Sequence, residues 1–348
     1  MRRVAGCWFI VVLALLSCQV AKQAKMTSNR WVNVPLTGSY FEARAVLALD
    51  KATAIIGGSH APGYGYNISA HEGAIYRWTG KNGARRVYTG RGQVIALAHH
   101  RASAGQVWAV ISAAWKDYRL LHSADAGVTW TQRGTIPATS FSALVAGPAG
   151  LWAHGIGTLL SSTDRGTSWR EDKTPHRPGL RSRFGWTGTG LLQFGDTLLV
   201  RPAGSESWNR DLADHQVIAV ASGDSAASSP WLVGRRGDGL VLGQLVANRA
   251  SGGVPYRVHW SAEIPARGVP VHAHVTGNTV RILATPVPGS ASQVAKGWVV
   301  LHSNDGGKTW QTDRLDASMN EVYPPAALCT GGGFAVARDG SLHVYQGS

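Results

Sequence analysis

An eight-residue pattern, S-x-D-x-G-x-[ST]-W, occurs three times and limits what this chain can fold into more than any other feature. The copies lie at residues 123–130, 162–169 and 303–310. A pattern that recurs within one chain indicates an internal repeat, and the repeat decides the fold class before any local argument. An apolar run precedes each copy, so the pattern follows a strand and is typical of a hairpin turn.

The residue types of this pattern suit a turn. The Asp carboxylate accepts hydrogen bonds from backbone N–H groups of its own turn, Gly allows a positive φ, and Trp covers the turn as the next strand begins. We interpret the aspartates as structural rather than catalytic or metal-binding, because a catalytic group is needed only once and this one recurs. The residues assigned this role are Asp125, Asp164, Asp305, Trp130, Trp169 and Trp310.

The pattern closely resembles the Asp-box, or BNR repeat, of sialidases, sortilin-type receptors and the photosystem II assembly-factor family, all of which are β-propellers. Units of about 40–50 residues, the length of a propeller blade, follow from Tyr40. The last unit has room for three strands only, and residues 31–36 supply a spare one. We predict an all-β, seven-bladed β-propeller closed by the N-terminal strand. A six-bladed ring is the alternative if the unit at 179–210 or 215–263 is misread.

The N-terminus predicts export. Arg2 and Arg3 precede a short apolar run, which is typical of a signal peptide over residues 1–17. The sequence Leu-Leu-Ser before Cys18 resembles a bacterial lipobox, which implies that Cys18 carries lipid. We therefore expect a tether over residues 18–29 and the propeller over residues 30–348. The resemblance implies a lipoprotein on the periplasmic side of a bacterial membrane, and Gln19 after the cysteine favours the outer membrane.

The charge of the chain favours an anionic partner. The formal net charge is +14, and loss of Arg2 and Arg3 with the signal peptide lowers it to +12. A basic surface attracts an acidic protein or an anionic component of the cell envelope. The export signal and the lack of a recognised nucleic-acid motif argue against nucleic acid.

The resemblance also implies where a partner binds. In propellers the Asp-box turns lie on one face, and the loops of the opposite face carry the ligands of the relatives. Aromatic residues and Arg on loops are typical of interface hot spots. The candidate binding residues on that face are Arg44, Tyr64, Tyr66, Trp115, Arg181, Arg183, Arg235, Arg236, Glu321 and Tyr323.

Two rival functions use some of the same residues. An Arg cluster with Tyr323 and Glu321 resembles the chemistry of a sialidase-type glycoside hydrolase, in which Tyr is the nucleophile. The R-I-P signature of sialidases is missing, and Arg44 stands instead in Glu-Ala-Arg-Ala. A lectin-like protein that binds glycan or lipopolysaccharide is the second rival. His272 and His274 share one face of a strand, but a metal needs convergent ligands.

We therefore expect a lipid-anchored, exported propeller that binds another macromolecule through its loop face. An assembly or scaffold factor and an immunity or inhibitor protein both fit this description. We predict no catalytic residue, no metal site and no cofactor, and we expect a monomer.

Overall fold

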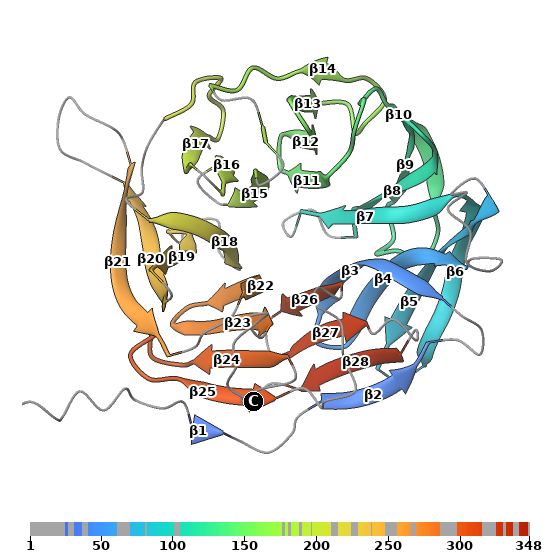
Figure 1. The fold of residues 1–348 in the computed structure, drawn as a ribbon. Helices are drawn as coiled ribbons and strands as arrows, with labels where there is room; N and C mark the ends of the chain where they lie inside the picture. The colour runs from blue at the N-terminus through green and yellow to red at the C-terminus, as the bar shows by residue number, and fades with distance from the viewer. Residues whose placement is uncertain are drawn as a thin grey trace, which may run out of the picture.

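The computed structural model describes most of the chain beyond the first 24 residues. The strands are arranged as blades around a central axis (Figure 1). The described residues contain no helix that is long and apolar enough to cross a membrane. The described residues are 25–26, 31–36, 41–60, 70–80, 82–100, 105–175, 178–179, 182–187, 190–195, 197–209, 215–223, 229–237, 239–247, 256–265, 269–285, 298–314, 325–329, 332–336 and 341–346.

Blades 1 to 3 are antiparallel sheets of four strands, each formed by consecutive segments of the chain. Blade 1 consists of β3 (Glu42–Asp50), β4 (Thr53–His60), β5 (Glu72–Thr79) and β6 (Gly83–Arg91). Blade 2 consists of β7 (Gln93–His99), β8 (Val107–Ala114), β9 (Asp117–Ser123) and β10 (Thr131–Ile136). Blade 3 consists of β11 (Ala143–Gly147), β12 (Gly150–Gly155), β13 (Thr158–Ser162) and β14 (Arg170–Glu171).

Blades 4 to 6 continue the ring, and blade 4 is the smallest of them. Blade 4 consists of β15 (Arg183–Thr187), β16 (Gly190–Phe194) and β17 (Leu199–Pro202). Its outer strand is reduced to one bridge, between Val200 and Asn209. Blade 5 consists of β18 (Gln216–Gly223), β19 (Trp231–Arg236), β20 (Gly239–Ala247) and β21 (Tyr256–Ile264). Blade 6 consists of β22 (Val269–Thr276), β23 (Thr279–Thr285), β24 (Val299–Ser303) and β25 (Gln311–Arg314).

Blade 7 closes the ring with strands from both ends of the chain. Its C-terminal strands are β26 (Ala326–Cys329), β27 (Gly332–Val336) and β28 (Ser341–Gln346). The N-terminal strand β2 (Trp31–Pro35) pairs antiparallel with β28, from Trp31 opposite Tyr345 to Pro35 opposite Ser341. The prediction of seven blades closed by the N-terminal strand is therefore confirmed, and the six-bladed alternative is wrong because blades 4 and 5 are separate sheets.

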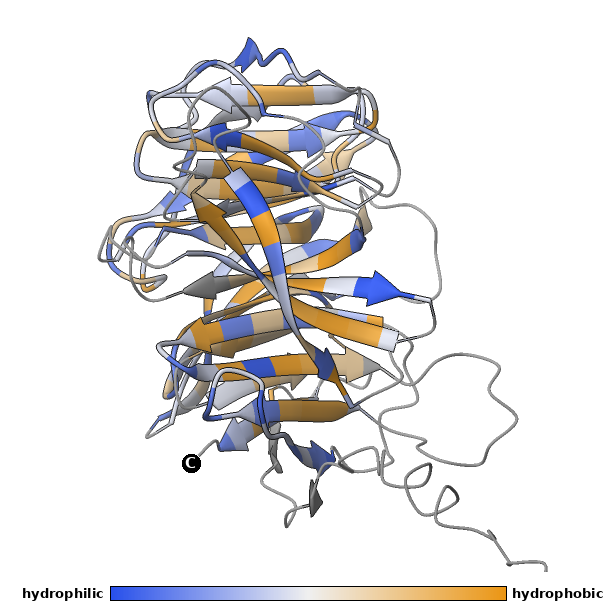
Figure 2. Ribbon diagram, turned by 90° about the vertical axis from the view of Figure 1, so that its left-hand side faces the viewer, coloured by the Kyte–Doolittle hydropathy of each residue, from blue (hydrophilic) through white to orange (hydrophobic). Residues whose placement is uncertain are grey.

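The hydrophobic core lies between neighbouring blades. Hydrophobic residues predominate along many of the strands, whereas the turns that connect them are mostly hydrophilic (Figure 2). Between blades 2 and 3, for example, Val110 and Leu120 pack with Leu144 and Leu151. Each blade therefore completes the core of the next one, which is how a repeat protein gains stability from its nearest-neighbour interfaces.

The glycines of the repeated turns also contribute to the contacts between blades. Gly166 has φ +88°, and a Cβ on it would lie 1.9 Å from Leu120 Cδ2 of blade 2. Gly307 is packed in the same way against Leu242 of blade 5, where a Cβ would lie 2.7 Å from Cδ2. Both the left-handed conformation and the close contact with the preceding blade require Gly here.

Candidate functional site

The course of the strands sorts the turns onto two faces of the ring. The three repeated turns, at residues 123–130, 162–169 and 303–310, join the third strand of a blade to the fourth. We call them the box turns, and the face on which they lie the box face. Because the chain reverses at every hairpin, the turns between second and third strands and the connections between blades lie on the opposite face. We call that second face the loop face.

Each box turn is held by hydrogen bonds within its own eight residues. Asp125 Oδ1 accepts the N–H of Val128 at 3.1 Å and the N–H of Thr129 at 2.9 Å, and its Oδ2 accepts the Thr129 hydroxyl at 2.6 Å. The Ser123 hydroxyl donates to Asp125 Oδ1 at 2.7 Å and accepts the Gly127 N–H at 2.8 Å. Both carboxylate oxygens therefore accept hydrogen bonds from within the turn.

The other two turns repeat most of these bonds. Asp164 accepts the N–H of Ser168 at 2.9 Å and its hydroxyl at 2.6 Å, and Asp305 accepts the same two groups of Thr309 at 2.9 and 2.6 Å. The hydroxyl bond is the main reason that the pKa of Asp164 falls to about 2. The pKa of Asp125 is likewise lowered to about 2, mainly by Thr129, and that of Asp305 is lowered by Thr309. Hydrogen bonds to the charged form favour it.

The tryptophans close two of these turns. Trp130 Nε1–H donates to the Gly127 carbonyl at 3.2 Å, and Trp310 Nε1–H donates to the Gly307 carbonyl at 2.9 Å. The Trp169 Nε1–H is buried and has no hydrogen-bond partner among the described residues. The box turns thus show the bonding of self-contained structural elements, in which each Asp carboxylate accepts hydrogen bonds from its own turn.

Five of the ten candidate binding residues lie within the described residues, and all five are on the loop face. Trp115 is at the tip of the β8–β9 turn and is 84% exposed. Lys116 has a positive φ of 65°, which keeps this turn to two residues and places the indole outward. Arg183 begins β15, and Arg235 and Arg236 end β19; all three are exposed.

Arg44, the fifth residue, begins the inner strand of blade 1 and forms an ion pair with Glu42 at 2.5 Å. The remaining predicted residues lie outside the described part of the chain: Tyr64, Tyr66, Arg181, Glu321, Tyr323 and the lipidation site Cys18.

The structure adds one apolar residue that the sequence analysis missed. Ile156 is at the tip of the β12–β13 turn and is 52% exposed, so it stands on the loop face of the blade next to Trp115. Its position between Gly155 and Gly157 is the only sequence signal, because an aliphatic residue inside a Gly turn has no strand to bury it.

Two sets of cations on the loop face differ in whether they form ion pairs. Arg44 and Arg119 are neutralised by carboxylates of the same strand, since Arg119 binds Asp117 at 2.8 Å. The cations of the second set form no ion pair with any described residue. This second set consists of Lys116, Arg183, Arg235 and Arg236.

The two histidines considered as metal ligands have other partners. His272 Nδ1 accepts the N–H of Leu328 at 3.2 Å, which links blade 6 to blade 7. His274 is fully buried, and its Nε2 lies 3.1 Å from Thr276 Oγ1. The described part of the chain contains no group of three or more His, Cys, Asp or Glu placed to hold a metal ion.

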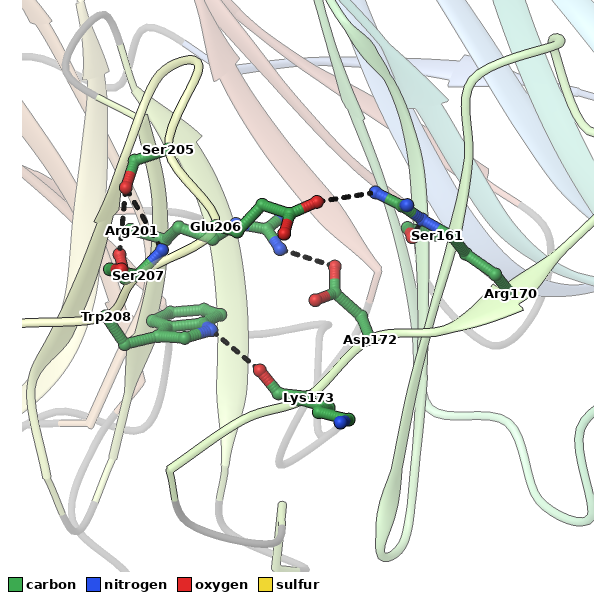
Figure 3. Close-up of polar contacts among 9 residues, drawn as sticks. All are labelled: Ser161, Arg170, Asp172, Lys173, Arg201, Ser205, Glu206, Ser207 and Trp208. Atoms are coloured by element: carbon green, nitrogen blue, oxygen red, sulfur yellow. Dashed lines mark hydrogen bonds and ion pairs between the residues drawn. The ribbon is translucent and has the colours of Figure 1, made fainter.

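A second polar cluster lies in the seam between blades 3 and 4 (Figure 3). Arg201 is 8% exposed and binds Asp172 at 2.5 Å. Its guanidinium carbon lies 5.5 Å from the ring centre of Trp152 and 5.4 Å from that of Trp208. Trp208 Nε1–H in turn donates to the Lys173 carbonyl at 3.1 Å. The contacts of Arg201 with Asp172 and Trp152, and that of Trp208 with Lys173, run between the two blades, so the cluster joins blade 4 to blade 3.

Two buried polar side chains of the same seam have unused hydrogen-bonding groups. His154 is 2% exposed, and neither ring nitrogen has a hydrogen-bond partner among the described residues. Its ring instead packs against Phe184 of blade 4, with 4.7 Å between centroids. Burial lowers the pKa of His154 to about 4, so the ring is neutral at pH 7. Gln193 is equally buried and leaves its Oε1 without a partner in the same ranges.

Comparison with known proteins identifies the architecture. No family model and no curated protein sequence matches this chain. A structure of Ycf48 bound to D1 peptide has a TM-score of 0.59 at 14% identity, covering 94% of this chain and all of the other. Ycf48 from Cyanidioschyzon merolae has a TM-score of 0.58 at 15% identity, covering 91% of this chain and 99% of the other.

An enzyme has a similar fold. The GH74 xyloglucanase from Xanthomonas campestris has a TM-score of 0.57 at 14% identity, with 92% of this chain aligned to 54% of that one. This chain is thus a seven-bladed β-propeller similar in structure to a peptide-binding protein and to a glycoside hydrolase. At such identities the likeness shows the fold alone, so function has to be argued from the residues on the two faces.

Proposed function

We propose that this protein is an exported, lipid-anchored Asp-box propeller without enzymatic activity, and that its loop face binds an acidic segment of another protein. The observation that carries the proposal is the combination of two exposed apolar tips, Trp115 and Ile156, with cations on the same face that form no ion pair among the described residues. Binding of this kind suits an assembly or scaffold factor and an immunity or inhibitor protein.

The apolar tips provide the short-range part of binding. Large exposed apolar side chains on neighbouring hairpins lose contact with water when a partner covers them, and Trp is enriched among residues that dominate interface energies. Both side chains are presented by tight turns of rigid blades, so little backbone ordering accompanies binding.

The cations provide the long-range part. Arg183, Arg235 and Arg236 are exposed and unpaired within the described residues, so an acidic partner gains attraction without breaking existing ion pairs. Such attraction speeds association and weakens as salt is added. Ycf48, which has a similar fold, is bound to D1 peptide in its own structure, and this supports a protein partner here as well.

Site-specific photo-crosslinking tests the proposal in the producing cell. A photoreactive amino acid replaces Trp115 or Ile156 on the loop face, and Val128 on the box face serves as the matched control because it is also exposed, at 45%. We expect a protein adduct from the two loop-face positions and none from Val128. An adduct at Val128 alone, or none at any position, would contradict the proposal.

Charge reversal tests the acidity of the partner. The double variant Arg235→Glu and Arg236→Glu should reduce the Trp115 adduct and make its yield less sensitive to added salt. The pair Lys308→Glu and Arg165→Glu on the box face changes the net charge by the same amount, serves as the control and should lower the yield less. Release of sialic acid from a sialoside, or of oligosaccharides from xyloglucan, by the purified protein, with no crosslinked partner, would favour a glycoside hydrolase instead.

A further inference from the structure

The direction of the N-terminal strand shows at which face the chain enters the propeller. β28 is the third strand of blade 7 and, like β9, β13 and β24, runs from the loop face to the box face. β2 is antiparallel to it, and Trp31 pairs with Tyr345 near the end of β28. Trp31 therefore lies at the box face, and Pro35, four residues later, lies towards the loop face.

A second pairing places the preceding residues at the same face. β1 (Lys25–Met26) pairs parallel with β25, with Lys25 opposite Gln311 and Met26 opposite Thr312. Gln311 directly follows the box turn at residues 303–310, so Lys25 lies beside that turn at the rim of blade 6. Figure 1 shows β1 along the outside of β25, close to β2.

The short distance along the chain limits how far the propeller can turn. Lys25 is the seventh residue after position 18. A fully extended chain spans at most about 3.6 Å per residue, so this segment reaches roughly 25 Å. A group held at residue 18 therefore stays within that distance of the box-face rim of blades 6 and 7. Trp115 and Ile156 belong to the loop face of blades 2 and 3, across the ring from that rim (Figure 1).

We propose that the anchored protein lies with the box-face rim of blades 6 and 7 towards the membrane and presents its loop face away from it. This inference rests on the proposed lipid anchor at Cys18. It adds that the partner approaches from the aqueous side, as a water-exposed protein segment rather than as the headgroups of the leaflet that holds the anchor.

The chemistry of the box face agrees with this orientation. Lys308 and Arg165 are exposed in two of the box turns and form no ion pair among the described residues. Cations near a membrane are attracted to anionic lipid headgroups. The carboxylates of the same turns are occupied by hydrogen bonds from their own turn, as described above. Lys308 stands beside the strand to which β1 pairs, so attraction there would strengthen the orientation that the tether imposes.

Vesicles that carry a maleimide headgroup test the orientation independently of lipidation in the cell. The mature chain beginning at Cys18 is coupled through that thiol; Cys329 is free but only 2% exposed, so it should not react. A fluorescent amino acid is placed at Lys308 or at Trp115, and headgroup-labelled lipid acts as the energy acceptor in phosphatidylcholine vesicles with and without phosphatidylglycerol.

We expect greater loss of donor fluorescence at position 308 than at position 115, and a smaller difference when a flexible Gly-Ser segment is inserted between residues 18 and 25. Equal losses, or a greater loss at 115, would overturn the inference. The anchor itself has a separate test, because Cys18→Ser should release the protein from the membrane fraction of the cell. If the Cys18→Ser variant stays in the membrane fraction, Cys18 is not the natural anchor. The vesicle experiment would still test the orientation of a protein held at residue 18.

Discussion

The outer turns of blades 3 and 4 occupy equivalent places in the repeat but are stabilised differently. Ser161 pairs with Arg170 in blade 3, and Val200 pairs with Asn209 in blade 4. This shared register aligns Ser162, the first residue of the box turn, with Arg201. In blade 3 the turn bonds to itself, whereas in blade 4 the residue at that position reaches back to Asp172 of the preceding blade.

The same register reveals a second difference along this seam. His154 of blade 3 pairs with Leu159, and its counterparts are Val110 of blade 2 and Leu283 of blade 6. Both counterparts are fully buried aliphatic residues, while His154 is a buried polar one. We infer that hydrogen bonds within the turn are enough to hold the outer turn of a four-stranded blade. The outer turn of the smaller blade 4 depends instead on contacts with blade 3.

Among variants of the two outer turns, Arg201→Ala is expected to lower the free energy of unfolding most. The change leaves Asp172 buried without its cation and removes the contacts with two tryptophans, so we expect a loss of about 3–5 kcal/mol in the free energy of unfolding. Urea unfolding followed by tryptophan fluorescence measures it. The control is Arg170→Ala in the same seam, whose pair with Glu206 is exposed at 3.7 Å and should contribute less than about 1 kcal/mol. Equal losses of stability in the two variants would contradict the view that Arg201 holds blade 4 to blade 3.

An intermediate effect is expected from His154→Leu, which restores the residue type of blade 6. Removing a buried polar group without a partner should stabilise the protein by about 1–3 kcal/mol at pH 7. Because the folded-state pKa is lowered to about 4 from 6.5, the unfolded chain binds the proton first. The wild-type protein should therefore lose stability as the pH falls from 6.5 to 4, by on the order of 3 kcal/mol.

The variant should lose that part of the pH dependence, which unfolding at several pH values measures. The control is His122→Leu, because His122 lies 2.6 Å from Gln106 through its Nε2 and so has a partner. A variant of His154 that is less stable than the wild type at pH 7 would show that the ring is bonded to water in the seam and is a necessary part of it.

The smallest effect is expected from Asp164→Ala in the box turn of blade 3. Its hydrogen bonds are local and exposed, so the thermal midpoint should fall by less than half of the decrease caused by Arg201→Ala. The contribution of Asp164 should be present above its ordinary pKa of 3.8 and should be lost as the pH falls through about 2. Thermal melts at pH 7 and pH 2 measure both. A larger decrease than that of Arg201→Ala would show that the box turns, and not the seam, hold blades 3 and 4 together.

Much of the architecture was predictable because it depends on short-range patterns. The box turns close within eight residues, so their spacing gave the period of the blades. The spare strand at residues 31–36 and the three-strand unit at the C-terminus indicated how the ring closes, and the pairing of β2 with β28 confirms it. The loop-face residues could be placed on one face because alternation of strand direction follows from the order of hairpins alone.

The contacts between blades could be learned only from the tertiary structure. Arg201 and Asp172 are 29 residues apart, and nothing in the spacing of either residue indicates the other. The exposure of Ile156, the burial of His154 and the contact of Gly166 with Leu120 likewise depend on which blade packs against which. A repeated turn is determined by bonds among neighbours in the chain, whereas a seam is determined by the packing of two sheets, which leaves no periodic mark on the sequence.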